Sequence, residues 1–157
     1  MVSIIVPTYN EKGNIPNLLK RISSLFANAR EYEIIVIDDN SNDGTWELLQ
    51  NERAKSNYPV KPFKKEGKDG KAYSLIEGFA KAAGDTLVMI DADLQYPPEA
   101  IPPMLSLLKE TDIVVANRKN YLAGKFRKFL SKSFRFLFGK GLFGLNCDIQ
   151  SGLKVFT

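Results

Sequence analysis

The chain has 157 residues, of which 44% are hydrophobic and 25% are charged, a balance typical of one soluble globular domain spanning 1–157. The sequence contains no histidine, which excludes imidazole-based catalytic dyads and histidine zinc sites. Its one cysteine, Cys147, excludes an intrachain disulfide. A metal bound by this chain would therefore need oxygen ligands.

Positive charge is concentrated in one part of the chain. Lysine and arginine total 22 against 18 acidic residues, a net charge of +4. Residues 113–147 hold eight basic residues and no acidic ones, so the rest of the chain sums to 14 minus 18, or −4. A basic, aromatic-rich segment of this kind favours anionic partners such as phosphates, nucleic acid or a membrane surface.

Targeting and membrane-spanning signals are not visible in the sequence. The apolar run at 2–7 is too short for a signal peptide and lacks a preceding basic region. Nowhere do 18 apolar residues follow one another, as a bilayer span would require. We therefore expect a cytoplasmic protein.

Predicted strands and helices alternate along the chain. In order, we expect a strand over 2–7, a helix over 14–28, a strand over 33–38, a helix after Asp43, a weaker strand over 59–63, a helix over 71–83, a strand over 86–90, a helix ending near Lys109 and a strand over 112–116. Asn14 is the expected cap of the first helix, and Gly84 is expected to end the third. This alternation predicts an α/β fold with a mostly parallel sheet and helices on both faces.

Polar and acidic residues follow the predicted strands. They occupy 7–11 after the first strand, 38–41 after the second, 91–95 after the strand over 86–90, and 117–118 after the last. Ligands of parallel sheets bind at the carboxyl ends of the strands. Acidic clusters that share one edge repel each other unless a cation or hydrogen-bond donors lie among them. We therefore expect the functional site at this edge.

The Asp91-Ala92-Asp93 segment is the strongest metal-site candidate. In an extended segment side chains alternate, so Asp91 and Asp93 would point to the same side and Gln95 would continue it. Two carboxylates and an amide oxygen suit Mg²⁺ or Mn²⁺, which completes its coordination with water and phosphate oxygens. A solvated acidic loop is the alternative interpretation, and the other acidic clusters on this edge make it less favoured.

The acid pair Asp38-Asp39 admits several interpretations. A phosphate-receiving regulatory domain places such a pair after its first strand, whereas here it follows the second. A dinucleotide fold needs a glycine-rich turn after the first strand, but PTYNEKGN at 7–14 has one glycine. Contact of Asp39 with a nucleoside ribose or base edge remains open, as does a purely structural capping role.

A helix over 125–140 would be strongly amphipathic, within a basic segment at 118–140. One arc holds the basic residues Lys125, Lys128, Lys132 and Arg135, and most of the phenylalanines fall on the other. A basic helix with an aromatic face is typical of an element that lies in a membrane interface. Packing of that face against the sheet is the alternative, while nucleic acid fits the phenylalanine content less well.

Several segments resemble family 2 glycosyltransferases of the GT-A, Rossmann-like fold. They are SIIVPTYNEKGNI at 3–15, EIIVIDDNSNDGTW at 33–46, GDTLVMIDADLQYPPEAIP at 84–102, DIVVANR at 112–118 and DIQSGLKVF at 148–156. They occur in the family's order along the whole chain, and DADLQ followed by two prolines is the most specific. Within the family, the chain is most similar to the dolichyl-phosphate (polyprenyl-phosphate) mannose synthases.

The resemblance implies a nucleotide-sugar donor, GDP-mannose or UDP-glucose, together with Mg²⁺ or Mn²⁺. It also implies inversion at the sugar's anomeric carbon and a polyprenyl-phosphate acceptor. The residues implied are Pro7, Tyr9, Glu11 and Asp39 at the nucleoside, Asp91 near the ribose or the metal, Asp93 and Gln95 at the metal, and Arg118, Arg127 and Ser131 at the acceptor phosphate.

These features together predict an inverting hexosyltransferase that is peripheral on the cytoplasmic face of a membrane and binds no nucleic acid. Mannose would move from GDP-mannose to a polyprenyl or dolichyl phosphate. The alternatives are a UDP-sugar donor, a hydroxyl acceptor, or a non-catalytic fragment that binds nucleotide or membrane. Family members continue beyond the SGLKVF segment, so we expect the domain to be incomplete at its carboxyl end.

Overall fold

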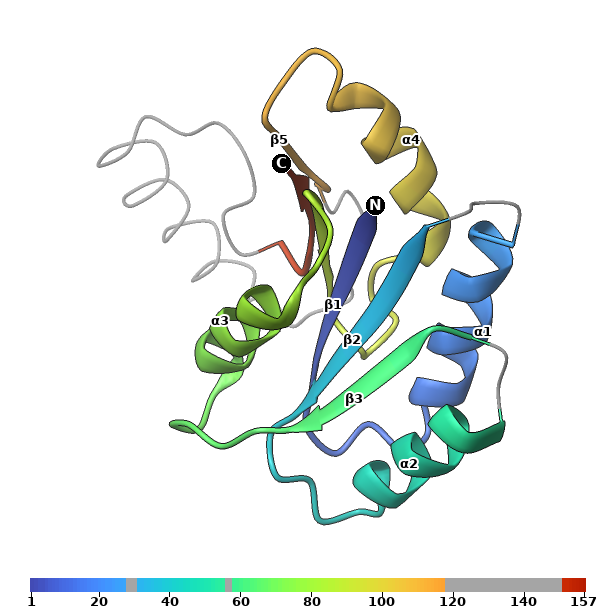
Figure 1. The fold of residues 1–157 in the computed structure, drawn as a ribbon, viewed down its shortest axis with the longest axis vertical. Coiled ribbons are helices and arrows are strands. Elements are labelled where there is room, and N and C mark those ends of the chain that lie inside the picture. Colours follow the sequence, from blue (N-terminus) through green and yellow to red (C-terminus); the bar gives the residue numbers. More distant parts are fainter. Residues whose placement is uncertain (28–30, 56–57, 118–150) are drawn as a thin grey trace, which may run out of the picture.

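The computed structural model describes residues 1–27, 31–55, 58–117 and 151–157. Strands and helices alternate along most of this chain, as Figure 1 shows. The elements are β1 (Val2–Thr8), α1 (Ile15–Leu25), β2 (Tyr32–Asp38), α2 (Thr45–Lys55), β3 (Val60–Lys64), α3 (Lys71–Lys81), β4 (Thr86–Ile90), the 3-10 helix η1 (Pro98–Ala100), α4 (Ile101–Leu107), β5 (Ile113–Val115) and β6 (Leu153–Phe156).

Within the described residues, six strands form one sheet in the order β3-β2-β1-β4-β6-β5. β1 pairs in parallel with β2 and β4, and β2 pairs in parallel with β3. β6 runs antiparallel to both β4 and β5, between which it lies. The predicted α/β class with a mostly parallel sheet is confirmed, and the inserted antiparallel strand is an addition to it.

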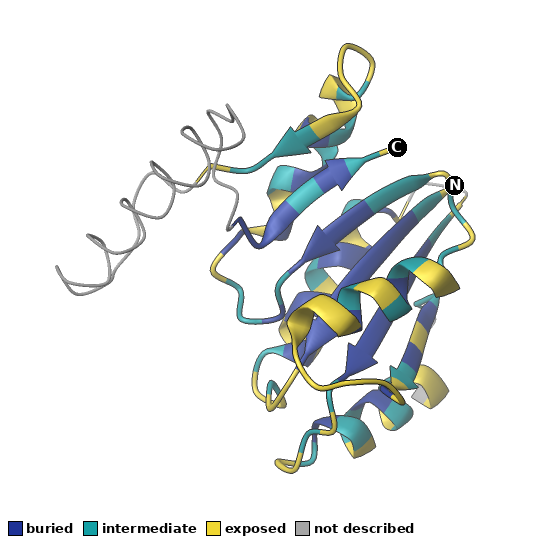
Figure 2. Cartoon of the chain, turned by 90° about the vertical axis from the view of Figure 1, so that its left-hand side faces the viewer, coloured by how far each residue is buried: buried dark blue, intermediate teal, exposed yellow. Residues whose placement is uncertain are grey.

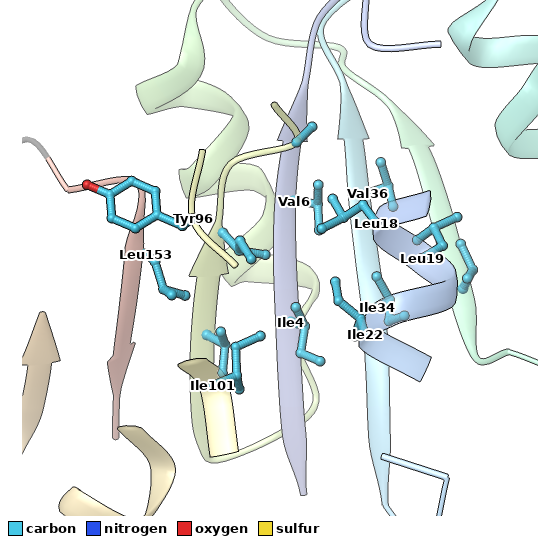
Figure 3. Close-up of a cluster of buried hydrophobic side chains, with 14 of the residues drawn as sticks. Ile4, Val6, Leu18, Leu19, Ile22, Ile34, Val36, Tyr96, Ile101 and Leu153 are labelled. Atoms are coloured by element: carbon cyan, nitrogen blue, oxygen red, sulfur yellow. The ribbon is translucent and has the colours of Figure 1, made fainter. Parts of the chain in front are cut away.

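Helices cover both faces of the sheet. α1, α2 and α4 lie on one face and α3 on the other (Figure 1). The apolar residues of α1 recur at helical spacing, so one side of the helix is buried in the core. Figure 2 shows the other face of the sheet, where the outward side of α3 is largely exposed and the strands beneath it are largely buried. The core residues labelled in Figure 3 include Ile4 and Val6 of β1, Ile34 and Val36 of β2, Leu18, Leu19 and Ile22 of α1, and Ile101 of α4.

The opposite face depends on a close approach of α3. Side chains alternate along a strand, so Ile5 and Ile37 point away from α1 and toward α3. Gly78 of α3 lies against them, and a Cβ there would overlap Ile5 Cγ2. The glycine therefore lets α3 pack directly on β1 and β2. This close packing determines where the first residues of α3 lie relative to the sheet.

The boundaries of the first helix differ from the expected 14–28. α1 spans Ile15–Leu25, and Asn14 occupies the position before it without a side-chain capping hydrogen bond. The Asn14 Nδ2 donates instead to Glu11 Oε2 at 2.6 Å. The predicted cap is therefore in the right place, but its side chain supports the preceding loop.

Gly84 was expected to end the third helix, and this prediction was wrong. α3 ends at Lys81, with Ala82 already extended. Gly84 lies against the start of β1, where a Cβ would come within 2.5 Å of the Met1 carbonyl oxygen. Its small size serves close packing between two backbone segments. The helix expected to reach Lys109 ends at Leu107.

The predicted helix over 125–140, and the basic segment 118–140 around it, lie outside the described residues. Its interfacial role stays a prediction. Among the residues that are described, no helix has both the length and the hydropathy that crossing a bilayer requires.

Candidate functional site

A pocket of about 180 Å³ opens at the carboxyl ends of β1, β2 and β4. Six of the residues predicted from the sequence line it, and they come from three separate strand-end segments. They are Pro7, Tyr9, Glu11, Asp39, Asp91 and Asp93. The expectation that polar residues following these strands meet at one edge is therefore confirmed. Thr8, Lys71, Ser74 and Ala92 also line the pocket and were not predicted.

The loop after β1 is fastened to the loop after β2. The Asn10 N–H donates to Ser41 Oγ at 2.8 Å, and the Asn42 N–H donates to Asn10 Oδ1 at 3.0 Å. The Glu11 N–H donates to Thr45 Oγ1 at 3.0 Å. These hydrogen bonds fix the backbone that presents Glu11 to the pocket.

Asp43 supports the same junction from the start of α2. Its Oδ1 accepts from the Thr45 N–H at 3.0 Å and from the Thr45 hydroxyl at 2.6 Å, and its Oδ2 accepts from the Lys12 N–H at 3.2 Å. These hydrogen bonds, that of the Thr45 hydroxyl first, lower the pKa of Asp43 below its ordinary value. The helix expected after Asp43 is confirmed as α2, and Asp43 holds the first residue of that helix, Thr45.

Asp39 is held by a buried lysine. Lys65, whose side chain is fully buried, places its Nζ 2.5 Å from Asp39 Oδ1 and also donates to the Gly70 carbonyl and to Ser74 Oγ. The Gly70 N–H donates to Asp39 Oδ2 at 2.8 Å. Asp39 therefore has a structural role as the partner of Lys65 and Gly70, and because it also lines the pocket its role is not purely structural. Lys65 was missed, because one lysine after a weak strand carries no distinctive pattern.

Asp38 has a different environment from its neighbour. Its side chain is fully buried, and its two oxygens accept from the Ser41 hydroxyl at 2.5 Å and the Ser41 N–H at 3.1 Å. It shapes the turn after β2 and does not line the pocket. An acid pair acting together on one phosphate or metal, as in a phosphate-receiving domain, is therefore not what this strand end forms.

Asp91 lies at the end of β4 and pairs with Lys71, the first residue of α3. The Lys71 Nζ is 2.6 Å from Asp91 Oδ1 and donates to Oδ2 at 2.8 Å. The Asp91 N–H donates to the Gly152 carbonyl at 2.9 Å, and a Cβ at Gly152 would overlap Asp91 Oδ2. The segment just before β6 thus packs directly against the Asp91 carboxylate, and only glycine fits at position 152.

The segment from Asp91 to Gln95 is a turn, so the extended arrangement expected from the sequence was wrong. Leu94 has a φ of 58°, and Asp93 Oδ1 accepts from the Gln95 N–H at 3.0 Å. Asp91 and Asp93 still line one pocket, whereas Gln95 is exposed and is not among the lining residues. A metal-binding role for Gln95 stays a prediction.

Each of the three strand-end loops contains one residue other than glycine with left-handed backbone. Asn10, Asn40 and Leu94 have φ values of 55°, 57° and 58°. Asparagine tolerates this conformation, but for leucine it costs on the order of 1–2 kcal/mol. Strained backbone of this kind tends to gather at functional sites. The turn at Leu94 directs Asp93 toward the pocket at such a cost.

The residues of the pocket fit a divalent cation with hard oxygen ligands. Asp91 and Asp93 both line it, and Asp93 Oδ2 has no hydrogen-bond partner among the described residues. The described part of the chain contains no group of three or more His, Cys, Asp or Glu side chains that could hold a metal ion alone. Mg²⁺ or Mn²⁺ here would complete its coordination with water or ligand oxygens.

Arg118, Arg127 and Ser131, predicted at an acceptor phosphate, lie outside the described residues. Their placement near the pocket stays a prediction.

Comparison with known proteins places these residues in a family context. The family model described as Glycosyl transferase family 2 matches residues 3–154. The chain is 41% identical over 139 residues to the dolichol-phosphate mannosyltransferase of Pyrococcus furiosus, covering 83% of this chain and 38% of that protein. It is 35% identical over 134 residues to the undecaprenyl-phosphate 4-deoxy-4-formamido-L-arabinose transferase of Aeromonas hydrophila, covering 84% and 41%. The chain therefore spans about two fifths of these relatives.

Solved structures with a similar fold include several sugar-transferring enzymes. Mannosyl-3-phosphoglycerate synthase from Rubrobacter xylanophilus has a TM-score of 0.75 at 21% identity, over 99% of this chain and 52% of that one. A mannosyltransferase from Pyrobaculum calidifontis in complex with GDP-Man and Mn²⁺ has a TM-score of 0.69 at 21% identity, over 99% and 44%. Glucosyl-3-phosphoglycerate synthase from Mycobacterium tuberculosis, with Mn²⁺, UDP-glucose and phosphoglyceric acid, has a TM-score of 0.75 at 20% identity, over 100% and 56%. The expected GT-A fold is confirmed.

Proposed function

The chain belongs to glycosyl transferase family 2, and from this premise we propose that its pocket binds a nucleotide-sugar donor for transfer of a hexose to a polyprenyl phosphate. The observation that supports this most strongly is that six predicted donor-site residues line one pocket. The names of the two curated relatives specify dolichol phosphate and undecaprenyl phosphate. GDP-mannose is the donor that we favour, since the 41% identical relative is a mannosyltransferase.

The nucleoside is proposed to lie between the loops after β1 and β2. Tyr9 is 57% exposed and offers an aromatic surface at the pocket. Glu11 and Asp39 supply carboxylate oxygens that accept hydrogen bonds from ribose hydroxyls or base N–H groups. Lys65 and the Gly70 N–H keep Asp39 in one orientation, so the carboxylate is ordered before a ligand arrives.

The diphosphate is proposed to lie beside Asp91 and Asp93. Mg²⁺ or Mn²⁺ held by these carboxylates and the diphosphate would neutralise the charge that develops on the leaving nucleoside diphosphate. The two aspartates orient this end of the donor, and the support of Asp91 by Gly152 limits how far that carboxylate can move.

The acceptor phosphate requires no catalytic base, because a phosphate monoester is already ionised at neutral pH, whereas a hydroxyl acceptor would need one. Transfer with inversion passes through an oxocarbenium-like transition state. We assign the acceptor phosphate to Arg118, Arg127 and Ser131, and the basic segment 118–140 to the cytoplasmic face of a membrane. Both assignments come from the sequence pattern and the resemblance.

The proposal is tested by measuring transfer of labelled mannose from GDP-mannose to a polyprenyl phosphate with Mn²⁺ or Mg²⁺, with UDP-glucose assayed in parallel. Asp93→Ala should lower transfer by about 100-fold or more, because several kcal/mol of charge stabilisation depend on the metal site. Its melting temperature should fall by only a few degrees, because the substitution also removes the hydrogen bond from the Gln95 N–H to Asp93 Oδ1. Asp112→Ala removes the same charge from an exposed position just before β5 and is the matched control.

Four results have distinct meanings. Transfer from GDP-mannose that requires Asp93 and tolerates Asp112→Ala supports the full proposal. Transfer from UDP-glucose alone retains the reaction class and corrects the donor. An Asp93→Ala protein with undiminished activity contradicts the metal assignment, and no transfer from either donor contradicts the proposed reaction.

A further inference from the structure

Lys71 is a pocket residue that the sequence did not predict. It is the first residue of α3, lines the pocket and forms an ion pair with Asp91 through both carboxylate oxygens. The side chain of Lys71 is 48% exposed and that of Asp91 is 23% exposed. The pair therefore joins α3 to the end of β4 on the solvent-accessible side of the pocket.

The two lysines at this edge of the sheet differ in their freedom to move. Lys65 is fully buried, and Asp39, Gly70 and Ser74 all accept hydrogen bonds from its ammonium. Within the described residues, Lys71 has Asp91 as its one partner. An ammonium with one partner, on a flexible and half-exposed side chain, can exchange that partner at little cost.

The position of Lys71 is unfavourable in a free helix. The amino end of a helix carries partial positive charge, so a lysine in the first turn is repelled and an anion is attracted. The first turn of α3 contains no acidic residue to offset this repulsion. Pairing with Asp91 compensates for it, and an anionic ligand in the same pocket would compensate for it equally well.

Asp91 cannot serve two cations well at once. A divalent cation bound to its oxygens would lie within a few ångströms of the Lys71 ammonium, and the two positive charges would repel each other. A diphosphate in the pocket would bring negative charge within reach of the displaced ammonium. The metal and the diphosphate would thus each favour movement of Lys71 away from Asp91.

We propose that Lys71 is an exchangeable counter-ion, which pairs with Asp91 before the donor binds and contacts the donor's diphosphate once a divalent cation takes Asp91. The inference rests on the proposed function and extends it, because it adds a donor-contacting residue. Lys71 then limits metal binding in the absence of a donor and strengthens donor binding in the presence of the metal.

The test compares Lys71→Met with wild type in two calorimetric titrations. The first titrates Mn²⁺ alone into the donor-free protein, and Lys71→Met should bind Mn²⁺ about 10-fold more tightly, because Asp91 has lost its competing cation. The second titrates GDP or UDP at saturating Mn²⁺, and Lys71→Met should bind about 10-fold more weakly. A general loss of folding would not move the two affinities in opposite directions.

Lys68→Met is the matched control. Lys68 lies in the loop just before α3 and is exposed, with its Nζ 5.8 Å from the Tyr73 ring centre, and it does not line the pocket. Its replacement removes the same charge and should leave both affinities near those of wild type. Lys71→Arg keeps the cation and should bind GDP or UDP better than Lys71→Met.

Opposite affinity changes that are confined to Lys71→Met support the inference. An unchanged Mn²⁺ affinity, an unchanged nucleotide affinity, equal effects of Lys68→Met, or no Mn²⁺ binding by either protein would overturn it. Opposite affinity changes without any sugar transfer would support the role of Lys71 and contradict the proposed function, so the two failures are distinguishable.

Discussion

Each end of the sheet contains a carboxylate paired with a lysine, but the surroundings of the pairs differ. At the amino end, Glu33 is 2% exposed and accepts from the Ser3 hydroxyl at 2.5 Å, the Ala83 N–H at 2.8 Å and Lys61 at 2.8 Å. The Gly84 N–H in turn donates to Ser3 Oγ. At the carboxyl end, the pairs that Asp39 and Asp91 form with lysines border an open pocket.

The two ends of the sheet differ in how far nearby lysines and hydrogen-bond donors offset the charge of the carboxylates. Glu33 receives three hydrogen bonds from the protein, so its cluster joins the first strands and the segment before β4 without a ligand. Among the described residues at the pocket, four carboxylates face two lysines, a balance of −2 that one divalent cation would neutralise. The four are Glu11, Asp39, Asp91 and Asp93, and the lysines are Lys65 and Lys71. Protein donors satisfy the buried carboxylate at the amino end, whereas the carboxylates at the pocket retain a net negative charge.

The largest expected effect comes from removing Lys65, the buried lysine that pairs with the pocket residue Asp39. Lys65→Met should lower the free energy of unfolding by about 3 kcal/mol, because it leaves Asp39 without its counter-ion while the Gly70 N–H remains. Lys61→Met, at the amino end, should cost about 1 kcal/mol or less, because Lys61 is 54% exposed and water replaces it more easily. Urea denaturation of both variants measures the difference, and equal losses would remove the contrast between the two ends.

A smaller effect is expected at the glycine behind Asp91. Gly152→Ala should lower the free energy of unfolding by about 2 kcal/mol, because the added methyl overlaps Asp91 Oδ2 and forces a local shift. It should also weaken Mn²⁺ binding. Gly13→Ala is the control, since a Cβ there meets nothing within 4 Å. A Gly152→Ala protein that retains the stability and Mn²⁺ affinity of wild type would mean that Asp91 needs no support from this segment.

The smallest effect concerns pH and the amino end. Burial alone would raise the pKa of Glu33, but hydrogen bonds from Lys61, Ser3 and the Ala83 N–H outweigh burial and lower the pKa below its ordinary value. A lowered pKa stabilises the fold above the unfolded-state pKa, and this stabilisation is lost as the pH falls through the folded-state pKa. Glu33→Gln should therefore cost about 1 kcal/mol at pH 7 and less at acid pH.

Thermal melts of Glu33→Gln and wild type between pH 7 and pH 3 check that prediction. Glu110→Gln removes the same charge from an exposed site and serves as the control. Curves for wild type and Glu33→Gln that stay parallel across this range would show that Glu33 does not contribute to the pH dependence.

The central strands and their ends were predictable from the sequence, because β1, β2 and β4 are short apolar runs buried in the sheet and followed at once by polar residues. The parallel arrangement then brings those polar residues together at one edge. Lys71 and Ser74 were missed because their approach to the pocket depends on how α3 docks through Gly78, a tertiary contact without a local pattern.

Two other features of the structure differ from what the sequence predicted. The turn at Leu94 was not expected, since leucine gives no signal for left-handed backbone. The antiparallel insertion of β6 beside β4 depends on pairing between segments far apart in the chain, which hydrophobic runs do not specify.

We expect the pocket to bind a divalent cation and a nucleotide sugar together. Thermal melts test this joint binding most directly when they are recorded with Mn²⁺ alone, with GDP-mannose alone and with both, and then repeated with UDP-glucose. At 100 times the dissociation constant, a ligand of the folded state adds about 2.7 kcal/mol, which raises the melting temperature by roughly 5–10 °C for a domain of this size. We expect this increase when Mn²⁺ and a nucleotide sugar are present together and much smaller changes with either alone. No increase with Mn²⁺ and either nucleotide sugar would contradict the assignment of this pocket.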